Sequence, residues 1–396
     1  MNNMKQALEG VKVLDLSRVL AVPFSSQILG DLGAEVRKVE IPKAGDTTRA
    51  WGPPYVGGES AYYLSANRNK ESITLNIKKG RDILEKLIKW ADVVLFNFRM
   101  KTIEKLELTY KDVKKINPEI IYGLVTGFGT SGPKADKPGF DVLAQAMGGI
   151  MSINGEPEGA PMKVPVAIDD ITSALYLTIG ILAALRHRDK TGEGQMIDVA
   201  LVDSQISWLV NLASSYLATG ENPKRRGNQH QTIVPYQAFE VKDGYIIVAV
   251  GSDKQWKSFC EMVEKPEWKT DEKYKTNSKR VEYREEVIPA IEKILKKNTK
   301  KYWIEKMDEF DVPGGPIKKF DEVFSDPQTK HREMVKEVKH PTADKVKLVG
   351  SPIKMSKTPV RFDKHPPLLG EHTEKILKDL GYSKDEIESF KEENII

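Results

Sequence analysis

The sequence is poor in cysteine and histidine, and its apolar runs are short. Cys260 is the single cysteine among 396 residues, which excludes an intrachain disulfide framework and makes a reducing, cytoplasmic compartment the expected one. The N-terminus lacks a charged region leading into an apolar core, so we predict no secretory signal. The longest apolar stretch, Ala174 to Leu185, is shorter than the ~20 residues of a membrane span and predicts a buried helix.

Missing residues and motifs also exclude several chemistries. The six histidines all lie at or beyond His187, so an acid/base pair in the first 186 residues cannot include one. GxxxxGK[ST], HExxH and GxSxG are absent, which removes the P-loop, zincin and serine-hydrolase interpretations. With one cysteine a multi-cysteine metal site is excluded, and we predict no metal site. Basic and acidic residues are interspersed with a net charge of +4, so no basic tract suits nucleic acid.

The order of apolar segments predicts an α/β protein of two domains. VKVLDLS, SSQILGDLGAEV and RKVEIP follow one another as strand, helix and strand, and the alternation recurs through ITLNI, RDILEKLIKWA, DVVLFNF and EIIYGLV. Strands that alternate with helices indicate a mostly parallel, Rossmann-like sheet. Beyond the linker-like ATGENPKRRGNQHQ, a predicted hairpin (YQAFEVKDGYIIVAVG) precedes a helical stretch rich in Lys and Glu. We predict a large domain at 1–210, completed by 345–396, and a smaller α+β domain at 226–325, with linkers at 211–225 and 326–344.

A glycine-rich segment after one predicted strand invites a dinucleotide interpretation. GFGTSG, from Gly127 to Gly132, fits the G-x-G-x-x-G pattern. Pro133 and Pro138 follow it, however, and no amphipathic helix begins there, so the helix dipole that should hold a pyrophosphate is missing. The pattern therefore does not predict nicotinamide binding.

Two adjacent carboxylates, Asp169 and Asp170, precede the long apolar helix. One interpretation is that one of them caps the helix N-terminus, which aspartate does well. The other is that a carboxylate, kept ionised by the helix dipole in a site without water, acts as a nucleophile. Apolar surroundings would then protect an acyl-aspartyl intermediate from hydrolysis, and free amides would stabilise an oxyanion.

Basic residues follow two of the predicted strands. Arg99, Lys101 and Lys105 come just after DVVLFNF, and Lys78 and Lys79 follow ITLNI. Ligands of α/β sheets bind where strands end, so these side chains are candidates for neutralising phosphates. The alternative is that they form solvated basic turns.

Eight segments in one order carry a resemblance that covers nearly the whole chain: LEGVKVLDLSRVLAVPFSSQILGDLGAEVRKVE, AGDTTRAWGPP, KESITLNIKKG, ADVVLFNFR, INPEIIYGLVTGFGTSGP, DITSALYLTIGILAALRHRDKTGEGQMIDVALVDS, DGYIIVAVG and PPLLGEHTEKILKDLG. Together they resemble the family III CoA-transferases, which include formyl-CoA and carnitine CoA-transferases, with α-methylacyl-CoA racemase as a sister branch. The resemblance implies an interlocked homodimer that transfers CoA from an acyl-CoA to a free carboxylic acid. Coenzyme A or acyl-CoA would be a substrate, and no cofactor would be bound permanently.

The same resemblance implies the roles of individual residues. Asp170 would be the catalytic residue that carries acyl and CoA groups, whereas Asp169 falls where relatives often have a small residue. CoA would lie along Leu20, Ala21, Leu75, Asn76, Ile77, Lys78, Asn97, Phe98, Arg99 and Lys105. Some relatives place an arginine where this chain has Ile41, so the adenine end is expected to be held otherwise, with Lys43 as a candidate.

Two further functions are alternatives to transfer. The racemase branch uses a histidine in a G-H-D segment as one base, and the matching segment here is Gly139-Phe140-Asp141, whose phenylalanine cannot move a proton. The formyl-CoA enzyme has a run of glycines over its acyl site, where this chain has RRGNQHQ, so formate and oxalate are not the expected substrates. A non-catalytic CoA-binding protein of the same fold is the other alternative.

Overall fold

The computed structural model describes residues 6–396 and contains two compact units. The larger unit holds residues up to Ile150, Lys163–Leu217 and Pro327–Ile396, and the smaller holds Met151–Met162 and Ala218–Asp326. The segments predicted as linkers are partly regular: 211–225 contains most of helix α10 (Val210–Thr219), and 326–344 contains α16 (Pro327–His331) and β12 (Val335–His340). The glycine and proline texture of a linker begins only after α10, at Gly220.

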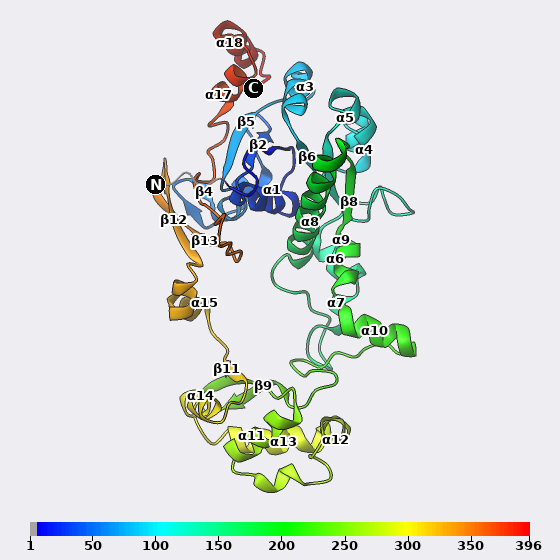
Figure 1. Ribbon diagram of the computed structural model, residues 1–396, viewed down its shortest axis with the longest axis vertical. Helices are drawn as coiled ribbons and strands as arrows, with labels where there is room; N and C mark the ends of the chain where they lie inside the picture. The colour runs from blue at the N-terminus through cyan, green and yellow to red at the C-terminus, as the bar shows by residue number, and fades with distance from the viewer. Residues whose placement is uncertain (1–5) are drawn as a thin grey trace. The chain divides into compact units, whose positions relative to one another are not determined.

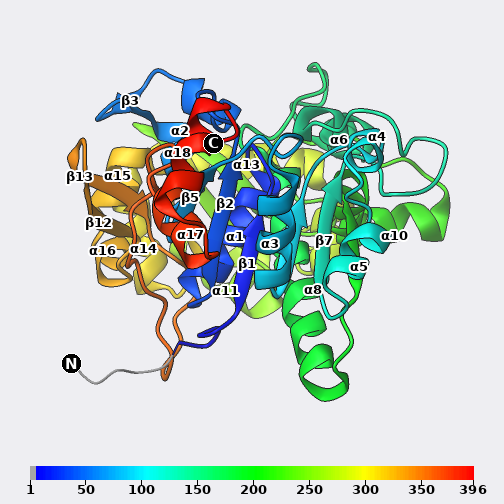
Figure 2. The same cartoon turned by 90° about the horizontal axis from the view of Figure 1, so that it is seen from above.

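The larger unit is built on the parallel sheet that the alternating pattern predicts. Six strands pair in the order β5-β2-β1-β6-β7-β8, all parallel (Figures 1 and 2). The strands are β1 (Lys12–Asp15), β2 (Glu35–Glu40), β5 (Lys70–Thr74), β6 (Val93–Phe96), β7 (Ile121–Thr126) and β8 (Met196–Ala200). The mostly parallel α/β architecture is thus confirmed.

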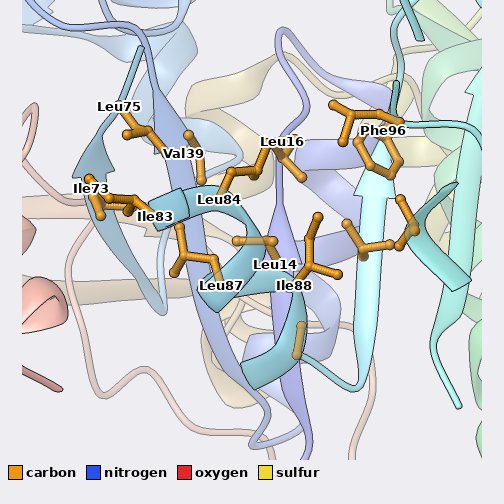
Figure 3. Close-up of a cluster of buried hydrophobic side chains, with 14 of the residues drawn as sticks. Leu14, Leu16, Val39, Ile73, Leu75, Ile83, Leu84, Leu87, Ile88 and Phe96 are labelled. Atoms are coloured by element: carbon orange, nitrogen blue, oxygen red, sulfur yellow. The ribbon is translucent and has the colours of Figure 1, made fainter. Parts of the chain in front are cut away.

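Alternate side chains of these strands face two separate apolar cores. Leu14, Val94 and Phe96 belong to one core, whereas Val13, Val93 and Leu95 belong to the other. Because both faces are buried, the strands read as continuous apolar runs. Figure 3 shows the first core, where Ile83, Leu84, Leu87 and Ile88 of one helix point toward the strand residues.

Helices cover both faces of the sheet. The first core includes residues of α3 (Arg81–Trp90), α5 (Tyr110–Ile116), α17 (Thr373–Asp379) and α18 (Lys384–Glu392). The second includes residues of α1 (Ala21–Asp31), α6 (Asp141–Met147), α8 (Ile168–Thr191) and α9 (Leu201–Ser207). The C-terminal segment therefore completes the large unit.

The predicted apolar helix is α8. By length and composition it is the one helix in residues 6–396 that could cross a membrane. One face of α8 packs against α1, α9, β7 and β8, but Leu175, Ile179 and Leu182 on another face are exposed, so the prediction of a buried helix is correct for one face and wrong for the other.

The remaining elements of the larger unit lie in its connections. They are η1 (Thr47–Ala50), β3 (Tyr55–Val56), β4 (Glu59–Ser60), α2 (Ala61–Ser65), α4 (Met100–Lys105), α7 (Ile150–Ile153, which reaches into the smaller unit) and β13 (Asp344–Val349), which pairs with β12.

The smaller unit has its own core around a three-stranded antiparallel sheet, β11-β10-β9. β9 (Tyr236–Val241) and β10 (Gly244–Ala249) form the predicted hairpin, and Gly244 takes a φ of 140° at its turn. The other elements are α11 (Asp253–Met262), η2 (Pro266–Lys269), α12 (Asn277–Glu282), α13 (Arg284–Leu295), α14 (Lys300–Glu309), β11 (Gly314–Pro316) and α15 (Phe320–Ser325).

The strand order of the large sheet places a crevice between β1 and β6. The chain runs from β1 outward to β2 on one side, and later continues with β6 on the other side of β1. The loops that leave the carboxyl ends of β1 and β6 therefore diverge. In open α/β sheets ligands bind at such a switch point.

Candidate functional site

Two neighbouring cavities lie at the carboxyl ends of the parallel strands. The first has a volume of about 490 Å³ and includes Lys78 and Lys105 in its wall, and we call it the lysine cavity. The second has a volume of about 460 Å³ and includes Asp141 and Asp170, and we call it the aspartate cavity. Arg18 and Phe98 line both cavities, so the two are adjacent at the switch point.

Asp170 and the ten residues that the resemblance places along CoA each line at least one of these cavities, whereas Asp169, Lys79 and Lys101 line neither. The lysine cavity includes Leu75, Asn76, Ile77, Lys78, Phe98 and Lys105. The aspartate cavity includes Leu20, Ala21, Asn97, Phe98, Arg99 and Asp170. Residues that are separated by up to 150 positions in the sequence are thus brought together at one edge of one sheet.

The segment Leu75 to Lys78 lies beyond the strand, and the chain turns at Ile77–Lys79, which corrects the predicted strand ITLNI. The strand is β5, Lys70–Thr74. Beyond it the backbone N–H of Asn76 donates to the carbonyl of Ile395, and the N–H of Gly80 donates to Asn76. Because the C-terminal residues take this hydrogen bond, the chain turns and presents Lys78 to the cavity.

Asp169 and Asp170 point to different surroundings although they are neighbours. Asp169 is fully buried, and Gln205 on α9, with its amide nitrogen facing the carboxylate, donates to both carboxylate oxygens at 2.7 and 3.2 Å. Asp170 is partly exposed and lines the aspartate cavity. Asp169 therefore ties α8 to α9, and Asp170 is the carboxylate that a ligand can reach.

Neither aspartate is the N-cap of α8, so the capping interpretation is wrong for both. The helix begins at Ile168, and the cap residue, Ala167, has no side chain that can accept a hydrogen bond. Instead, Asp141 Oδ1 accepts from the backbone N–H of Asp169 at 2.8 Å. A residue 28 positions earlier thus supplies the cap.

Burial and neighbouring negative charge raise the pKa of both carboxylates at the start of α8. Burial, together with the nearby Asp141, raises the pKa of Asp170 to about 7. Burial, Asp141 and Asp170 also raise the pKa of Asp169 to about 7. Both carboxyl groups therefore titrate near neutral pH, which is typical of a functional site.

Aromatic side chains bound the aspartate cavity. Trp51 and Phe140 line it, and Trp51 packs edge-to-face on Tyr62 with ring centroids 5.1 Å apart. Burial, and the charges of Asp170 and Asp141, raise the pKa of Tyr62 to about 12, which keeps its hydroxyl protonated. The cavity thus combines an ionisable carboxylate with largely apolar walls.

The amide of Asn97 holds the loop after β1. Asn97 Oδ1 accepts from the N–H of Arg18 at 3.0 Å, and its Nδ2 donates to the carbonyl of Arg18 at 2.6 Å. Both polar atoms of the Asn97 side chain are therefore used within the chain, across the crevice between β1 and β6. Asn97 shapes the wall of the cavity by fixing Arg18.

A buried charge network lies behind the same loop. Lys38 is fully buried, pairs with Asp46 at 3.0 Å and donates to the carbonyl of Ser17. Asp15 pairs with Lys70 at 3.2 Å; burial alone raises the pKa of Asp15, but Lys70 and Lys38 hold it well below its usual value. Breaking one such pair would leave an uncompensated buried charge, so the network fixes the loop.

The adenine-end candidate, Lys43, does not line either cavity. Its Nζ donates to Asn394 Oδ1 at 2.7 Å near the C-terminus. Ile41 does line the lysine cavity, and so does Glu40, whose carboxylate is taken by Arg49 and Ser72. The cations that remain in this wall are Lys78, Lys105 and Arg18.

Sequence reasoning missed Arg18, Trp51, Lys137 and the capping role of Asp141. Arg18 and Lys137 had no signal beyond their charge, but Asp141 follows Phe140 in the segment that was compared with the G-H-D motif. The residues that the structure describes include no cluster of three or more His, Cys, Asp or Glu that could hold a metal ion.

Comparison with known proteins identifies the class. CoA-transferase family III matches residues 8–373. The human succinyl-CoA:glutarate CoA-transferase is 44% identical over 382 residues, which are 96% of this chain and 87% of that protein. The succinate–glutarate CoA-transferase of Agrobacterium fabrum is 42% identical, covering 96% of this chain and 97% of that protein.

A solved structure agrees with this result. The crystal structure of a CAIB/BAIF family protein from Brucella suis has a TM-score of 0.84 and 41% sequence identity, covering 95% of this chain and 100% of that one. The chain belongs to CoA-transferase family III. It is a CoA-transferase, and CoA thioesters and carboxylic acids are its substrates.

Proposed function

We propose that the protein transfers CoA from a dicarboxylic acyl-CoA, such as succinyl-CoA, to a second dicarboxylate through covalent intermediates on Asp170. One observation carries the mechanism: Asp170 lines a cavity adjoining a second cavity with two lysines, whereas Asp141, the other carboxylate in that wall, accepts hydrogen bonds from Gln145 and from the N–H of Asp169. The names of the human and Agrobacterium fabrum relatives support the substrate class.

The transfer is an exchange of one thioester for another. An oxygen of Asp170 attacks the thioester carbon, the C–S bond breaks, and a mixed anhydride and CoA thiolate result. The thiolate then attacks the Asp170 carbonyl carbon, the donor acid leaves as its carboxylate, and an aspartyl-CoA thioester remains. The acceptor carboxylate repeats these steps in reverse, so that Asp170 is regenerated and no proton is consumed overall.

This route needs positioning and exclusion of water rather than an external source of energy. Apolar groups, including Leu20, Phe98 and Trp51, line the cavity and would keep water from the anhydride. The placement of Asp170 in the first turn of α8 favours its ionised form through the helix dipole, against the effect of burial. Thioester energy is retained throughout.

Coenzyme A would lie across both cavities. Lys78 and Lys105 would bind the 3′-phosphate of its adenosine end, beside Leu75, Asn76 and Ile77. The pantetheine arm would pass Phe98 and Asn97 toward Leu20, Ala21 and Asp170, with Arg99 at the rim. Lys78 and Lys105 line one cavity and Asp170 lines the adjoining one, which suits a ligand with a phosphate at one end and a sulfur at the other.

The substrate class is tested with a panel of acids. The protein is incubated with succinyl-CoA and equal amounts of glutarate, succinate, acetate and benzoate, and new thioesters are identified by mass spectrometry. We expect glutaryl-CoA to form fastest. Faster formation of a monocarboxylic thioester would contradict the proposed class.

The intermediate is tested by trapping. Hydroxylamine added during turnover should convert Asp170 into its hydroxamate, which peptide mass spectrometry locates. Label on Asp169 instead of Asp170 would show that the assignment within the pair is wrong.

The epimerase alternative would need two groups that exchange an α-proton. None of the residues that line the two cavities is a histidine, and Phe140 occupies the position compared with the histidine of the racemase branch. An epimerase would incorporate solvent deuterium into the acyl group without any acceptor acid. We expect no such incorporation.

We also propose that the chain has two domains, a large one at 1–210 completed by 345–396 and a small one at 226–325. We further propose that two chains interlock as a homodimer in the cytoplasm. An exposed apolar stripe on α8 supports a second chain: Leu175, Ile179 and Leu182 are 46%, 61% and 37% exposed at helical spacing. Light scattering should give the mass of a dimer for the wild type. Ile179→Glu should dissociate into monomers at higher protein concentrations than the wild type does.

A further inference from the structure

Arg18 occupies the point where the two cavities meet. It follows β1, and Phe98 follows β6, so the two side chains lie on either side of the switch point. The guanidinium carbon of Arg18 is 5.4 Å from the centre of the Phe98 ring. These two are the residues common to both cavity walls.

The guanidinium of Arg18 has no ion pair or hydrogen bond with any residue in the range 6–396. Its contact with the Phe98 ring leaves its five N–H donors free for a ligand. By contrast, the buried Arg37 and Arg68 each pair with an aspartate. A half-buried arginine with free donors in a cavity wall is suited to an anion that accepts two parallel hydrogen bonds.

The backbone around Arg18 is held on both sides. Asn97 binds the N–H and the carbonyl of Arg18 itself. The next residue, Val19, has a φ of 70°, which is unfavourable for a β-branched side chain, and its N–H donates to both oxygens of Asp46 at 3.2 and 3.3 Å. Asp46 is in turn paired with buried Lys38. Strain that is held by such contacts is typical of functional loops.

We propose that Arg18 binds the diphosphate of coenzyme A, an inference that rests on the proposed placement of CoA across both cavities. In CoA the diphosphate lies between the 3′-phosphoadenosine and the pantetheine arm. Arg18 lies between the lysines of one cavity and Asp170 of the other. A planar guanidinium there can donate to oxygens of the diphosphate and so set how far the thioester reaches toward Asp170.

The position of Arg18 also explains how this chain can bind CoA with Ile41 at the position where some relatives have an arginine. Ile41 and Arg18 line the same lysine cavity, and Lys43 does not. Arg18, from the loop after β1, can therefore bind the nucleotide end of the ligand although the residue after β2, Ile41, is apolar.

The test compares four ligands, two for binding and two for turnover, that differ in their phosphates. Affinities of Arg18→Gln for CoA and for 3′-dephospho-CoA are measured by calorimetry, and kcat/KM is measured with succinyl-CoA and succinyl-pantetheine. We expect both CoA affinities to fall by about ten- to a hundredfold, while kcat/KM for succinyl-pantetheine, which has no diphosphate, stays within about twofold. Arg18→Lys should recover part of the lost affinity, because lysine restores the positive charge but cannot donate two parallel hydrogen bonds as a guanidinium does.

Arg188→Gln is the matched control, because Arg188 is a half-buried arginine near the far end of α8, about 27 Å along the helix from Asp170. It should leave all four values unchanged, and thermal melts verify that each variant is folded.

Unchanged CoA affinity in folded Arg18→Gln would overturn the proposal. An equal loss with succinyl-pantetheine, or a higher KM for the acceptor acid alone, would assign Arg18 to the acyl site and also overturn it. The wild-type measurements test the proposed function separately. If the wild type neither bound CoA nor formed glutaryl-CoA, the proposed function itself would be wrong.

Discussion

The two cavities at the carboxyl edge of the sheet adjoin each other but differ in chemistry. The wall of the lysine cavity offers the cations Lys78 and Lys105, and its carboxylates, Glu40 and Asp46, are engaged by arginine and lysine side chains. The aspartate cavity holds two carboxylates, one of which has a pKa raised to about 7. The difference supports the proposal that one cavity supplies binding and the other supplies the reaction. If so, changes in the first should raise KM, whereas changes in the second should lower kcat.

The largest effect is expected from Asp170→Asn. An amide cannot form the mixed anhydride, so kcat should fall by at least about a thousandfold. Because Asn has nearly the same shape, the affinity for CoA measured by calorimetry should change by no more than a few fold. Asp169→Asn is the matched control, since it removes the neighbouring carboxylate without touching the cavity. Retained transfer by Asp170→Asn would contradict the assignment of the reaction to the aspartate cavity.

The next largest effects are expected in the lysine cavity. Lys78→Gln and Lys105→Gln should each raise KM for succinyl-CoA by about fivefold and leave kcat unchanged, because each exposed lysine contributes one charge to ground-state binding. With 3′-dephospho-CoA thioesters the two variants should equal the wild type. Lys101→Gln is the control, because Lys101 pairs with Asp136 and lies outside both cavities. A fall in kcat would show that the two cavities do not divide binding from reaction.

Much of this arrangement follows from the sequence, because strong local patterns specify it. The apolar runs of β1, β6 and β7 and the spacing in α3 identify a parallel sheet, and strand ends then locate the ligand site. The hairpin of β9 and β10 is likewise readable from Asp243-Gly244. These elements are determined by residues close together in the chain.

The remainder depends on contacts between distant residues. The cap of α8 comes from Asp141, the end of β5 depends on Ile395, and the loop at Arg18 is fixed by Asn97. Hydrogen bonds between residues 28 to 319 positions apart have no local pattern, so sequence reasoning could not find them. The choice between Asp169 and Asp170 likewise required the position of Gln205 on α9.

A smaller effect should appear in the pH dependence of the aspartate cavity. In the proposed mechanism Asp170 must be ionised to attack, and burial and Asp141 raise its pKa to about 7, so kcat/KM should fall about tenfold per pH unit below that value. Asp141 raises this pKa by its charge, so Asp141→Asn should move the acidic limb to lower pH, while its amide oxygen can still cap α8. Asp141→Glu, which keeps the charge, is the control. An acidic limb that stays in place would show that Asp141 does not influence Asp170.

The smallest effect is expected on stability, and it separates Asp169 from the reaction. The pKa of Asp169 is raised from 3.8 to about 7 in the folded chain, so its ionisation destabilises the fold progressively as pH rises from about 4 to about 7. Asp169→Asn should remove this loss and be more stable than the wild type at pH 8 by at most about 4 kcal/mol, because the rise is about three pKa units and each unit is worth about 1.4 kcal/mol, with no gain at pH 4. Urea unfolding at the two pH values measures the difference, and Asp203→Asn, an exposed change on the same helix as Gln205, is the control. A gain of the same size at both pH values would mean that the charge of Asp169 is not its cause.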